Sequence, residues 1–444
     1  MIFERDIANS ILDEFSGHEI VFLLGTRQTG KTTIAKILQN KWNEKNPLSP
    51  LSPINSVNSL YIDLEDRTYR NNFNATSIDA LKNVLLIEGI DTQKPGLLIL
   101  DEVQLLNDPS NTLKLLHDHF INLKVVATGS SILEIKQKFS DSLAGRKKVY
   151  IIQPLNFDEF LLFKGEEKLR RLRYLFKKED EKGKQKLADS GTVGHYEESL
   201  STLFNEYLIY GSYPEVVLLK NKKDKIEKIG SIVTSYIQKD IRDIARIDNI
   251  DGYNNLLKYL SINTGSEFNS ANASKTLSLQ RNTIQRYVNL LTETFVIKEL
   301  KPFFINKNKE ISKSVKIYYK DTGVRNFQIK NFNNMEFRED AGKLYENYIF
   351  NVLDNTADIL TSNYFYRTTS KTEIDFILEN EDGLSLIEVK SGIFKNIPRA
   401  VMEFELKYKK TIKIKNKLII NKSYFNYNKN KNNKEVKFIP IFLI

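Results

Sequence analysis

Short apolar runs alternate with amphipathic helical segments along the first part of the chain. Five runs have the length of a buried strand, and enough residues for a helix separate most of them. These runs are Ile20–Leu24, Leu60–Leu64, Leu97–Leu100, Lys124–Thr128 and Lys148–Ile152. The alternation predicts an α/β fold with a parallel sheet of about five strands over residues 1–160.

The pattern changes after this segment. Residues 161–200 are rich in Lys, Glu and Asp, which is typical of a charged linker or an exposed helix pair. From Leu203 to Glu299 the apolar spacing is helical, and from Lys316 onward strand-like runs are interrupted by helices. We therefore expect a helical domain with a winged helix at 201–325 and a mixed α/β domain at 326–444.

Composition narrows the possible classes of protein. The 444 residues are 41% hydrophobic and 27% charged, which is normal for a chain of several globular domains. The absence of cysteine excludes disulfides, thiolate metal sites and a cysteine nucleophile. No apolar run approaches the ~18 residues of a membrane span, and the first residues lack a secretory signal. We expect a cytoplasmic protein without membrane contact.

Basic residues exceed acidic ones, and much of the excess lies near the C-terminus. The formal net charge is +10, and residues 401–444 hold eleven lysines against three glutamates. A basic surface attracts the phosphate groups of nucleic acid. It is equally typical of a solvated face, so charge alone does not decide for a nucleic-acid partner.

A glycine-rich loop follows the first apolar run. The segment from Gly25 to Thr32 matches the pattern G-x-x-x-x-G-K-[ST], and a helix with an apolar stripe leaves it. Backbone N–H groups in such a loop cradle phosphates, Lys31 reaches the β- and γ-phosphates, and the Thr32 hydroxyl binds Mg²⁺. The sequence therefore predicts ATP and Mg²⁺ as cofactors. The expected nucleotide-binding residues of the loop are Gly25, Thr26, Arg27, Gln28, Thr29, Gly30, Lys31, Thr32 and Thr33.

Two acidic residues end the third apolar run. Asp101 fits the residue that holds magnesium through its shell, and Glu102 fits the base that orients the attacking water. The alternative is an ordinary N-cap of the following helix. The fourth run ends at Thr128, and this hydroxyl or that of Ser130 is a candidate sensor of the γ-phosphate. A hydroxyl cap on the next helix explains these residues equally well.

Arg146 precedes the fifth apolar run. An arginine at this point of the chain is a candidate finger that stabilises phosphoryl charge, in its own subunit or in a neighbour within a homo-oligomer. Pairing with a carboxylate, or with a phosphate of another molecule, is the competing interpretation.

Nine segments, taken in order, resemble a group of bacterial and archaeal AAA-type ATPases whose C-terminal half has no known function. They are Gly25–Thr33, Leu97–Glu102, Thr128–Ser131, Ser142–Arg146, Pro154–Phe160, Tyr210–Glu215, Tyr236–Asp240, Tyr318–Gly323 and Glu388–Lys390. The resemblance covers nearly the whole chain and implies an ATPase core, a winged helix and a nuclease-like fold. The chain departs from the group at Pro47–Pro53 and Gly165–Glu198, which lie outside the motifs.

The middle of the chain contains a helix-turn-helix candidate. Ser270–Thr276 and Arg281–Thr294 are predicted helices, and Phe295–Leu300 with Lys316–Tyr319 are expected as wing strands around a tip at Asn306–Lys309. The second helix exposes side chains that read base edges or phosphates. These are Arg281, Asn282, Gln285, Arg286 and Asn289. The competing interpretation is an interdomain scaffold that never touches DNA.

A second candidate site lies near the C-terminus. Asp375 followed by Glu388-x-Lys390 has the spacing of PD-(D/E)XK nucleases, which predicts a restriction-endonuclease-like fold. Asp375 and Glu388 on neighbouring strands are expected to share Mg²⁺, with Glu346 as a further acidic ligand and Lys390 polarising water. The proline of the motif is absent, because Ile374 precedes Asp375. An ordinary exposed acid–lysine pair, or a fold that only binds, is the alternative.

These features together predict an ATP-hydrolysing AAA-type protein that couples ATP to DNA binding or processing. The first alternative is an ATP-dependent regulatory switch whose nuclease-like domain only binds nucleic acid or protein. The second alternative is an ATPase that acts on protein partners.

Overall fold

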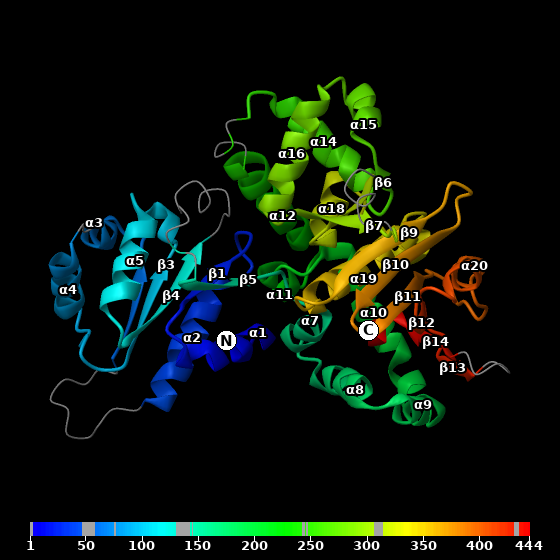
Figure 1. The fold of residues 1–444 in the computed structure, drawn as a ribbon, viewed down its shortest axis with the longest axis horizontal. Coiled ribbons are helices and arrows are strands. Elements are labelled where there is room, and N and C mark those ends of the chain that lie inside the picture. Colours follow the sequence, from blue (N-terminus) through cyan, green and yellow to red (C-terminus); the bar gives the residue numbers. More distant parts are fainter. Residues whose placement is uncertain are drawn as a thin grey trace. The chain divides into compact units, whose positions relative to one another are not determined.

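The computed structural model describes residues 3–46, 58–74, 77–129, 143, 145–241, 245, 247–305, 314–429 and 435–444 (Figure 1). The chain forms two compact units. Unit 1 comprises residues 1–154, 239–246 and 293–295, and unit 2 comprises residues 155–238, 247–292 and 296–444.

Unit 1 is built on a five-stranded sheet with the order β2-β3-β4-β1-β5, in which all neighbouring strands are parallel. The strands are β1 (Ile20–Leu24), β2 (Ser59–Asp63), β3 (Gly96–Asp101), β4 (Leu123–Gly129) and β5 (Lys147–Ile151). Every residue of β1, β3 and β4 is buried, which explains why these strands read as continuous apolar runs. The predicted parallel α/β core is confirmed.

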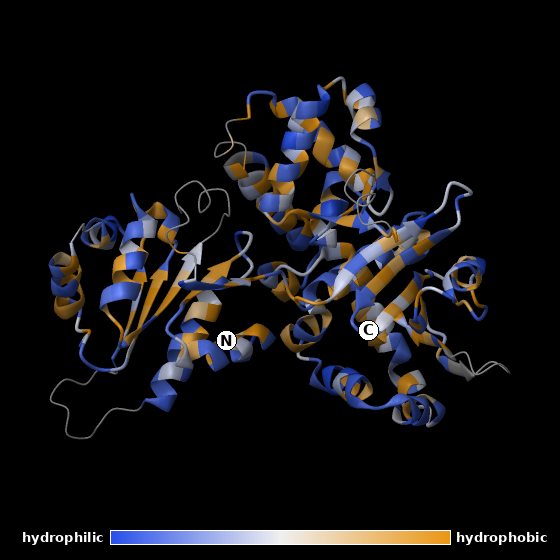
Figure 2. Cartoon of the chain, in the orientation of Figure 1, coloured by the Kyte–Doolittle hydropathy of each residue, from blue (hydrophilic) through white to orange (hydrophobic). Residues whose placement is uncertain are grey.

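Helices pack against both faces of this sheet. They are α1 (Asp6–Asp13), α2 (Lys31–Lys45), α3 (Arg67–Phe73), α4 (Ile78–Ile87) and α5 (Pro109–His119), with the short turns η1 (Glu14–Ser16) and η2 (Val103–Leu105). Val21 and Leu23 join the cluster of α1 and α2, whereas Ile20 and Phe22 join the cluster of α3, α4 and α5. The apolar colouring of the central strands in Figure 2 follows this burial.

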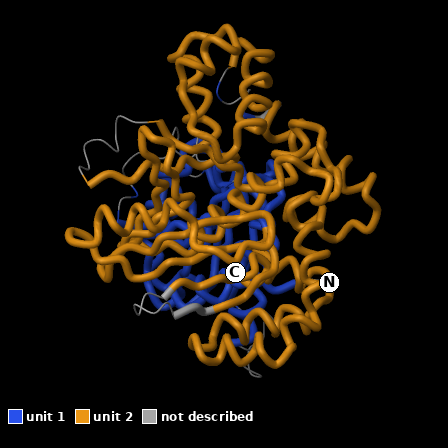
Figure 3. The backbone as a smooth tube through the Cα atoms, turned by 90° about the vertical axis from the view of Figure 1, so that its right-hand side faces the viewer, with its two compact units in different colours: residues 1–154, 239–246, 293–295 blue, residues 155–238, 247–292, 296–444 orange. Residues whose placement is uncertain are grey.

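The first part of unit 2, the unit drawn in orange in Figure 3, is helical. Its helices are α7 (Phe157–Phe163), α8 (Glu167–Lys178), α9 (Glu181–Asp189), α10 (Thr192–Tyr210), α11 (Pro214–Leu218) and α12 (Lys222–Ile232), followed by the π-helical segment η4 (Val233–Asp240). The charged stretch 161–200 therefore forms helices. Leu169, Leu172 and Phe176 of α8 are buried in the core of the unit. Arg173 pairs with Asp158 at 2.5 Å, so α8 is anchored rather than free in solvent.

A helix–strand motif follows in unit 2. It consists of α14 (Ile250–Ile262), β6 (Glu267–Phe268), α15 (Ser270–Leu277), α16 (Arg281–Glu293), β7 (Ile297–Pro302) and β8 (Val315–Tyr319). The three strands are antiparallel in the order β6-β8-β7. Ile284, Val288 and Leu291 turn the apolar stripe of α16 inward. The expected wing tip at 306–309 lies outside the described residues.

The remainder of unit 2 extends this small sheet to nine strands, in the order β13-β14-β12-β11-β10-β9-β7-β8-β6. The added elements are α18 (Thr322–Gln328), η5 (Met335–Phe337), α19 (Ala341–Thr356), β9 (Ser362–Arg367), β10 (Glu373–Asn380), β11 (Gly383–Val389), α20 (Arg399–Tyr408), β12 (Ile414–Asn421), β13 (Asn426–Lys429), β14 (Glu435–Pro440) and η6 (Ile441–Leu443). Strands β9, β10 and β11 are antiparallel, and β12 is parallel to β11. Helices α19 and α20 belong to separate apolar clusters on this sheet.

Two of the segments that carry the resemblance, 210–215 and 318–323, pack against each other inside unit 2. The carboxylate of Asp321 accepts hydrogen bonds from Ser212 N at 2.7 Å and from Val324 N at 2.9 Å. A Cβ on Gly323 would lie 2.2 Å from the carbonyl oxygen of Tyr210. Packing therefore explains both motifs. Residues 318–323 supply a buried acid, and residues 210–215 supply a backbone N–H group that donates to it.

Within the described residues, the structure contains no helix long and apolar enough to span a bilayer.

Candidate functional site

The glycine loop of unit 1 joins the end of β1 to the start of α2. Gly30 adopts φ 94°, which few residues other than glycine adopt. A Cβ on Gly25 would lie 2.2 Å from the carbonyl oxygen of Ile152, so the chain that follows β5 permits only glycine there. The loop ends at the N-terminus of α2, where backbone N–H groups and the helix dipole attract anions.

An arginine far upstream in the sequence braces this loop. Arg5 is buried, and its guanidinium donates to the carbonyl of Thr29 at 2.8 Å and to that of Gln153 at 2.9 Å. The Thr29 hydroxyl donates to the carbonyl of Thr26 at 2.9 Å. Hydrogen bonds from Arg5 and from the Thr29 hydroxyl therefore fix the backbone of the glycine loop. Arg5 was not a sequence candidate, because it belongs to no motif.

Lys31 lies inside the loop. Its amine donates to the carbonyls of Gly25 at 3.2 Å and Thr26 at 3.1 Å, and the side chain is 5% exposed. Burial lowers the pKa of Lys31, and the carboxylates of Glu102 and Asp101 oppose that shift. A cation held in a concave backbone loop is the arrangement that receives a phosphate group.

Asp101 is the centre of a hydrogen-bond network at the carboxyl edge of the sheet. Thr32 Oγ1 donates to its carboxylate at 2.7 Å, and the Tyr61 hydroxyl donates to the same oxygen at 2.6 Å. The Thr128 hydroxyl donates to the other oxygen. Residues from α2, β2, β3 and β4 therefore meet at one carboxylate, as expected where parallel strands end side by side.

Thr128 also holds the neighbouring acid in place. Its hydroxyl accepts a hydrogen bond from Glu102 N at 3.0 Å while it donates to Asp101. The Thr128 hydroxyl therefore bonds the Asp101 carboxylate and the Glu102 backbone N–H, and its role as a phosphate sensor stays a prediction. The other candidate, Ser130, lies outside the described residues.

Glu102 adopts a strained backbone conformation. Its φ is 59°, in the left-handed region, and its carboxylate accepts a hydrogen bond from the buried amide of Gln104. A non-glycine residue in this region costs on the order of 1–3 kcal/mol, and such strain clusters at functional sites. Gln104 was not a sequence candidate, and no local pattern would have indicated it.

Arg146 lies at the opposite edge of the same sheet. Its carbonyl accepts a hydrogen bond from the N–H of Ile20, the first residue of β1, whereas the glycine loop follows the last residue of β1. Its guanidinium pairs with Asp118 at 2.8 Å, and hydrogen bonds from Arg146 and His117 lower the pKa of Asp118 to about 2. A five-residue strand is about 16 Å long, so Arg146 does not reach the loop of its own subunit. A finger role stays a prediction only for a neighbouring subunit.

The C-terminal acids meet in unit 2. The register that pairs Phe376 with Ile387 places Asp375 opposite Glu388, as the sequence predicted for neighbouring strands. Asp375 accepts from Val389 N at 2.8 Å, and Lys390 donates to Glu388 at 3.0 Å. The β9–β10 register shifts between residues 374 and 377, and such bulges re-aim side chains next to functional sites.

A buried lysine from an earlier strand completes this cluster. Lys316 on β8 is 1% exposed and pairs with Glu373 at 2.6 Å and Glu346 at 3.7 Å. Burial and the nearby Asp375 raise the pKa of Glu346 to about 7. The same two causes raise the pKa of Glu388 to about 9. Lys316 was expected only as the start of a wing strand, because its partners lie 30 and 57 residues further along the chain.

Lysines lie among the acids of this cluster. In the part of the chain that the structure describes, no group of three or more His, Cys, Asp or Glu side chains is placed to hold a metal ion. Glu346, Asp375 and Glu388 were expected as Mg²⁺ ligands, and that role stays a prediction; Lys316 pairs with Glu346 and Lys390 pairs with Glu388. The P-loop needs no comparable set, since Mg²⁺ there uses one or two protein ligands and the phosphates.

The polar face of α16 is exposed, as the sequence predicted. The five side chains on it are Arg281, Asn282, Gln285, Arg286 and Asn289. Arg281 donates to the Ser270 hydroxyl at 2.8 Å, and Gln285 donates to Asn289 at 3.0 Å. The face thus combines cationic and amide groups that suit contacts with bases and phosphates.

The parallel sheet, the glycine loop and the acid that ends β3 define unit 1 as the core of a P-loop ATPase. Family models agree with that class. Residues 17–161 match the AAA domain, residues 201–335 match the domain of unknown function DUF8612, and residues 341–443 match the domain of unknown function DUF4143. The chain thus contains an AAA domain of the P-loop class followed by two domains of unknown function, which confirms the resemblance.

Relatives that match most of the chain are named as uncharacterized proteins. An uncharacterized protein of Methanocaldococcus jannaschii is 26% identical over 386 residues, which are 86% of this chain and 76% of that protein. An uncharacterized protein of Mycobacterium bovis is 22% identical over 406 residues, which are 90% and 77% of the two chains. A solved Walker-type ATPase of Pyrococcus abyssi covers 74% of this chain and 96% of its own, with 14% identity and a TM-score of 0.46. At that TM-score the similarity says nothing about function.

Proposed function

We propose that this protein hydrolyses ATP with Mg²⁺ at the glycine loop of unit 1 and uses the reaction to control nucleic-acid binding or processing by unit 2. The observation that carries the proposal is the network in which Thr32, Tyr61 and Thr128 all donate to Asp101. The link between this carboxylate and the first turn of the P-loop helix supports Asp101 as the residue that holds the magnesium shell.

Each residue of the site then has one role. Lys31 balances the negative charge of the β- and γ-phosphates, and the backbone N–H groups before it orient them. Thr32 and Asp101 hold Mg²⁺, which neutralises charge on the phosphate oxygens. Glu102, fixed by its backbone and by Gln104, accepts the proton of the attacking water.

Two substitutions test this site. Lys31→Ala removes the buried cation and is expected to abolish both ATP binding and hydrolysis. Glu102→Gln keeps the shape of the side chain and is expected to retain ATP binding while hydrolysis falls at least about 100-fold. ATP binding is measured with a fluorescent analogue and hydrolysis by phosphate release. Unchanged affinity of Lys31→Ala for ATP and Mg²⁺ would reject the assignment.

Two arrangements in unit 2 support a nucleic-acid partner. The order α14-β6-α15-α16-β7-β8 with the sheet β6-β8-β7 fits a winged helix at 201–325, with α16 as the helix that presents its polar face. The order α19-β9-β10-β11-α20-β12, with β12 parallel to β11, fits the nuclease-like domain that the Asp375 and Glu388 spacing predicts at 326–444.

The lysine-neutralised acids favour a second candidate function. Lys316 pairs with Glu373, and Lys390 pairs with Glu388, so positive charge already lies beside the acids. In this alternative the C-terminal domain therefore acts as a binding module under ATP control. The test is incubation of plasmid DNA with Mg²⁺ or Mn²⁺, with and without ATP, using the wild type, Asp375→Ala and Lys390→Ala. Cutting by the wild type that both substitutions abolish favours processing, and no cutting under any condition favours the switch.

An ATPase that acts only on protein partners predicts a different result. Nucleic-acid binding by lysines and arginines weakens steeply as salt increases, because counterions are released on binding. A binding series from low to moderate salt with the whole chain therefore separates the classes. The absence of salt-sensitive binding to DNA or RNA would remove both nucleic-acid functions.

A further inference from the structure

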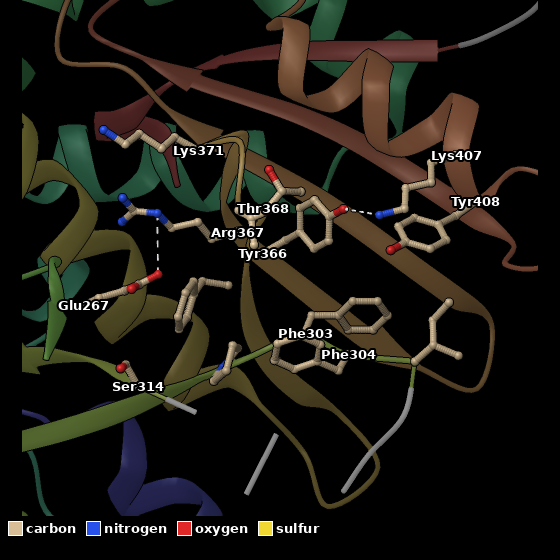
Figure 4. Close-up of a pocket in the computed structure, with 14 residues that line it drawn as sticks. Glu267, Phe303, Phe304, Ser314, Tyr366, Arg367, Thr368, Lys371, Lys407 and Tyr408 are labelled. Atoms are coloured by element: carbon tan, nitrogen blue, oxygen red, sulfur yellow. Dashed lines mark hydrogen bonds and ion pairs between the residues drawn. The ribbon is translucent and has the colours of Figure 1, made fainter. Parts of the chain in front are cut away.

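Unit 2 contains a hollow of about 800 Å³ that no motif indicated. The end of β7 and the residues after it, the end of β9 and the turn after it, and the end of α20 line the hollow, together with Glu267 and Ser314 (Figure 4). In this view Phe303 and Phe304 lie on one side, Arg367 and Lys371 on a second, and Lys407 with Tyr408 on a third.

Aromatic rings form the floor and part of the walls. Phe303 and Tyr366 are buried, and both rings pack on Phe404, at centroid distances of 6.0 Å and 4.8 Å. Tyr408 also packs on Phe404, at 4.6 Å, and is half-buried, as is Phe304. Phe404 therefore packs against the buried rings of the hollow, while Phe304 and Tyr408 keep part of their surface exposed.

Cations surround these rings. Lys371 is exposed on a turn that is fixed by hydrogen bonds between Thr368 and Lys371 at 3.0 Å and between Thr368 and Thr372 at 2.9 Å. Lys407 is exposed, lies 5.0 Å from the centre of the Tyr408 ring and donates to the Tyr366 hydroxyl at 3.2 Å. Among the described residues that line the hollow, Glu267 is the one acid, and it pairs with Arg367 at 3.5 Å, so the described lining has an excess of positive charge.

Aromatic surfaces within a cationic rim are the combination that binds single-stranded nucleic acid. Unpaired bases stack on aromatic side chains, and lysines contact the phosphates between them. A duplex does not suit this hollow, because its base faces are already covered by neighbouring base pairs. From these contacts we propose that the hollow binds a short segment of single-stranded nucleic acid.

The hollow is linked to the acid cluster of the same unit. Arg367 in its wall pairs with Glu373 at 3.4 Å, and Glu373 lies two residues before Asp375 on β10. Glu373 also holds Lys316 at 2.6 Å. A strand bound here therefore lies beside the candidate nuclease-like site. This inference deepens the nucleic-acid part of the proposed function and rests on it.

The test uses the whole chain and a fluorescein-labelled 20-nucleotide oligothymidine, with its duplex for comparison. The charge reversal Lys371→Glu with Lys407→Glu is expected to weaken single-strand binding by at least about tenfold and to reduce the salt slope by about 1.4. Phe304→Ala is expected to weaken binding by about tenfold at every salt concentration. Anisotropy measures affinity, and thermal unfolding verifies that each variant is folded.

The matched control reverses two exposed lysines of unit 2 outside the hollow, Lys168→Glu with Lys222→Glu. It changes the net charge by the same amount and is expected to keep wild-type affinity within about threefold. If the hollow variants bind like this control, the hollow is not the binding site, although the nucleic-acid function survives. If the wild type binds the duplex but no single strand at low salt, only the inference fails, and if it binds neither, the nucleic-acid function fails as well. Preference for the duplex also overturns the inference.

Discussion

Thr128 offers the sharpest test of how unit 1 positions its acids. Its side chain is fully buried, donates to Asp101 and accepts from Glu102 N at 3.0 Å. Thr128→Val keeps the shape and removes both hydrogen bonds. A hydrogen bond to a charged group contributes about 1.5–3 kcal/mol, and an unsatisfied buried N–H costs about 1–3 kcal/mol. We therefore expect a loss of roughly 3 kcal/mol in the free energy of unfolding.

The effect on ATP hydrolysis should exceed the effect on ATP binding. Without the Thr128 hydroxyl, the peptide of Glu102 is free to leave its strained conformation, and the carboxylate moves with it. A misplacement of about 1 Å costs on the order of 100-fold in rate. We expect kcat to fall about 100-fold and KM to change less than about threefold. Thr128→Ser, which keeps the hydroxyl, should retain most of the activity.

A control separates positioning from general destabilisation. Thr112 on α5 is also buried, and its hydroxyl donates to the carbonyls of Phe73 and Asp108, both at 3.2 Å. Thr112→Val should lower the denaturation midpoint but leave kcat within about twofold. Steady-state phosphate release and urea unfolding measure both quantities. A folded Thr128→Val protein that hydrolyses ATP at the wild-type rate would refute the positioning role.

Three further predictions follow from described contacts. Gly323→Ala places a Cβ 2.2 Å from a backbone oxygen and should cost at least about 1–3 kcal/mol of stability in urea, whereas Gly194→Ala, with open space around it, should be neutral or stabilising. Burial raises the pKa of Asp321 to about 6. The folded state therefore binds more protons than the unfolded state between pH ~4 and ~6. The free energy of unfolding should fall by about 3 kcal/mol as pH rises through this window. Asp321→Asn should remove this dependence on pH. Tyr61→Phe removes one of three donors to Asp101 and should raise the Mg²⁺ concentration needed for half-maximal hydrolysis about fivefold to tenfold. Urea unfolding verifies that the variant is folded, with an expected loss of about 1.5–3 kcal/mol for the hydrogen bond to a charged group.

Local sequence patterns predicted the P-loop core because the glycine loop and the buried strands are each short, continuous segments of the chain. The glycine spacing fixes the loop, and strands β1, β3 and β4 are buried on both faces, so their apolar runs are unambiguous. The meeting of Thr32 with Asp101 follows from the rule that parallel strands end at one edge. The same rule predicts that a residue before a strand, such as Arg146, lies at the other edge.

The contributions that sequence did not predict come from residues that match no motif. Arg5 braces the loop from a helix cap, and Tyr61 reaches Asp101 from the neighbouring strand. Lys316 neutralises acids on α19 and β10. An isolated arginine, tyrosine or lysine carries no periodic signal, so only the tertiary arrangement reveals these roles.

The position of Lys316 affects how the C-terminal region behaves when it is separated from the rest. The family model that covers this region begins at residue 341, whereas Lys316 enters from β8. A fragment that starts at residue 341 would keep Glu346, Glu373 and Asp375 but lose the ammonium group that stands among them. Its acids would repel one another more strongly and take up protons or cations more readily, so metal affinity measured on such a fragment would exceed that of the intact protein.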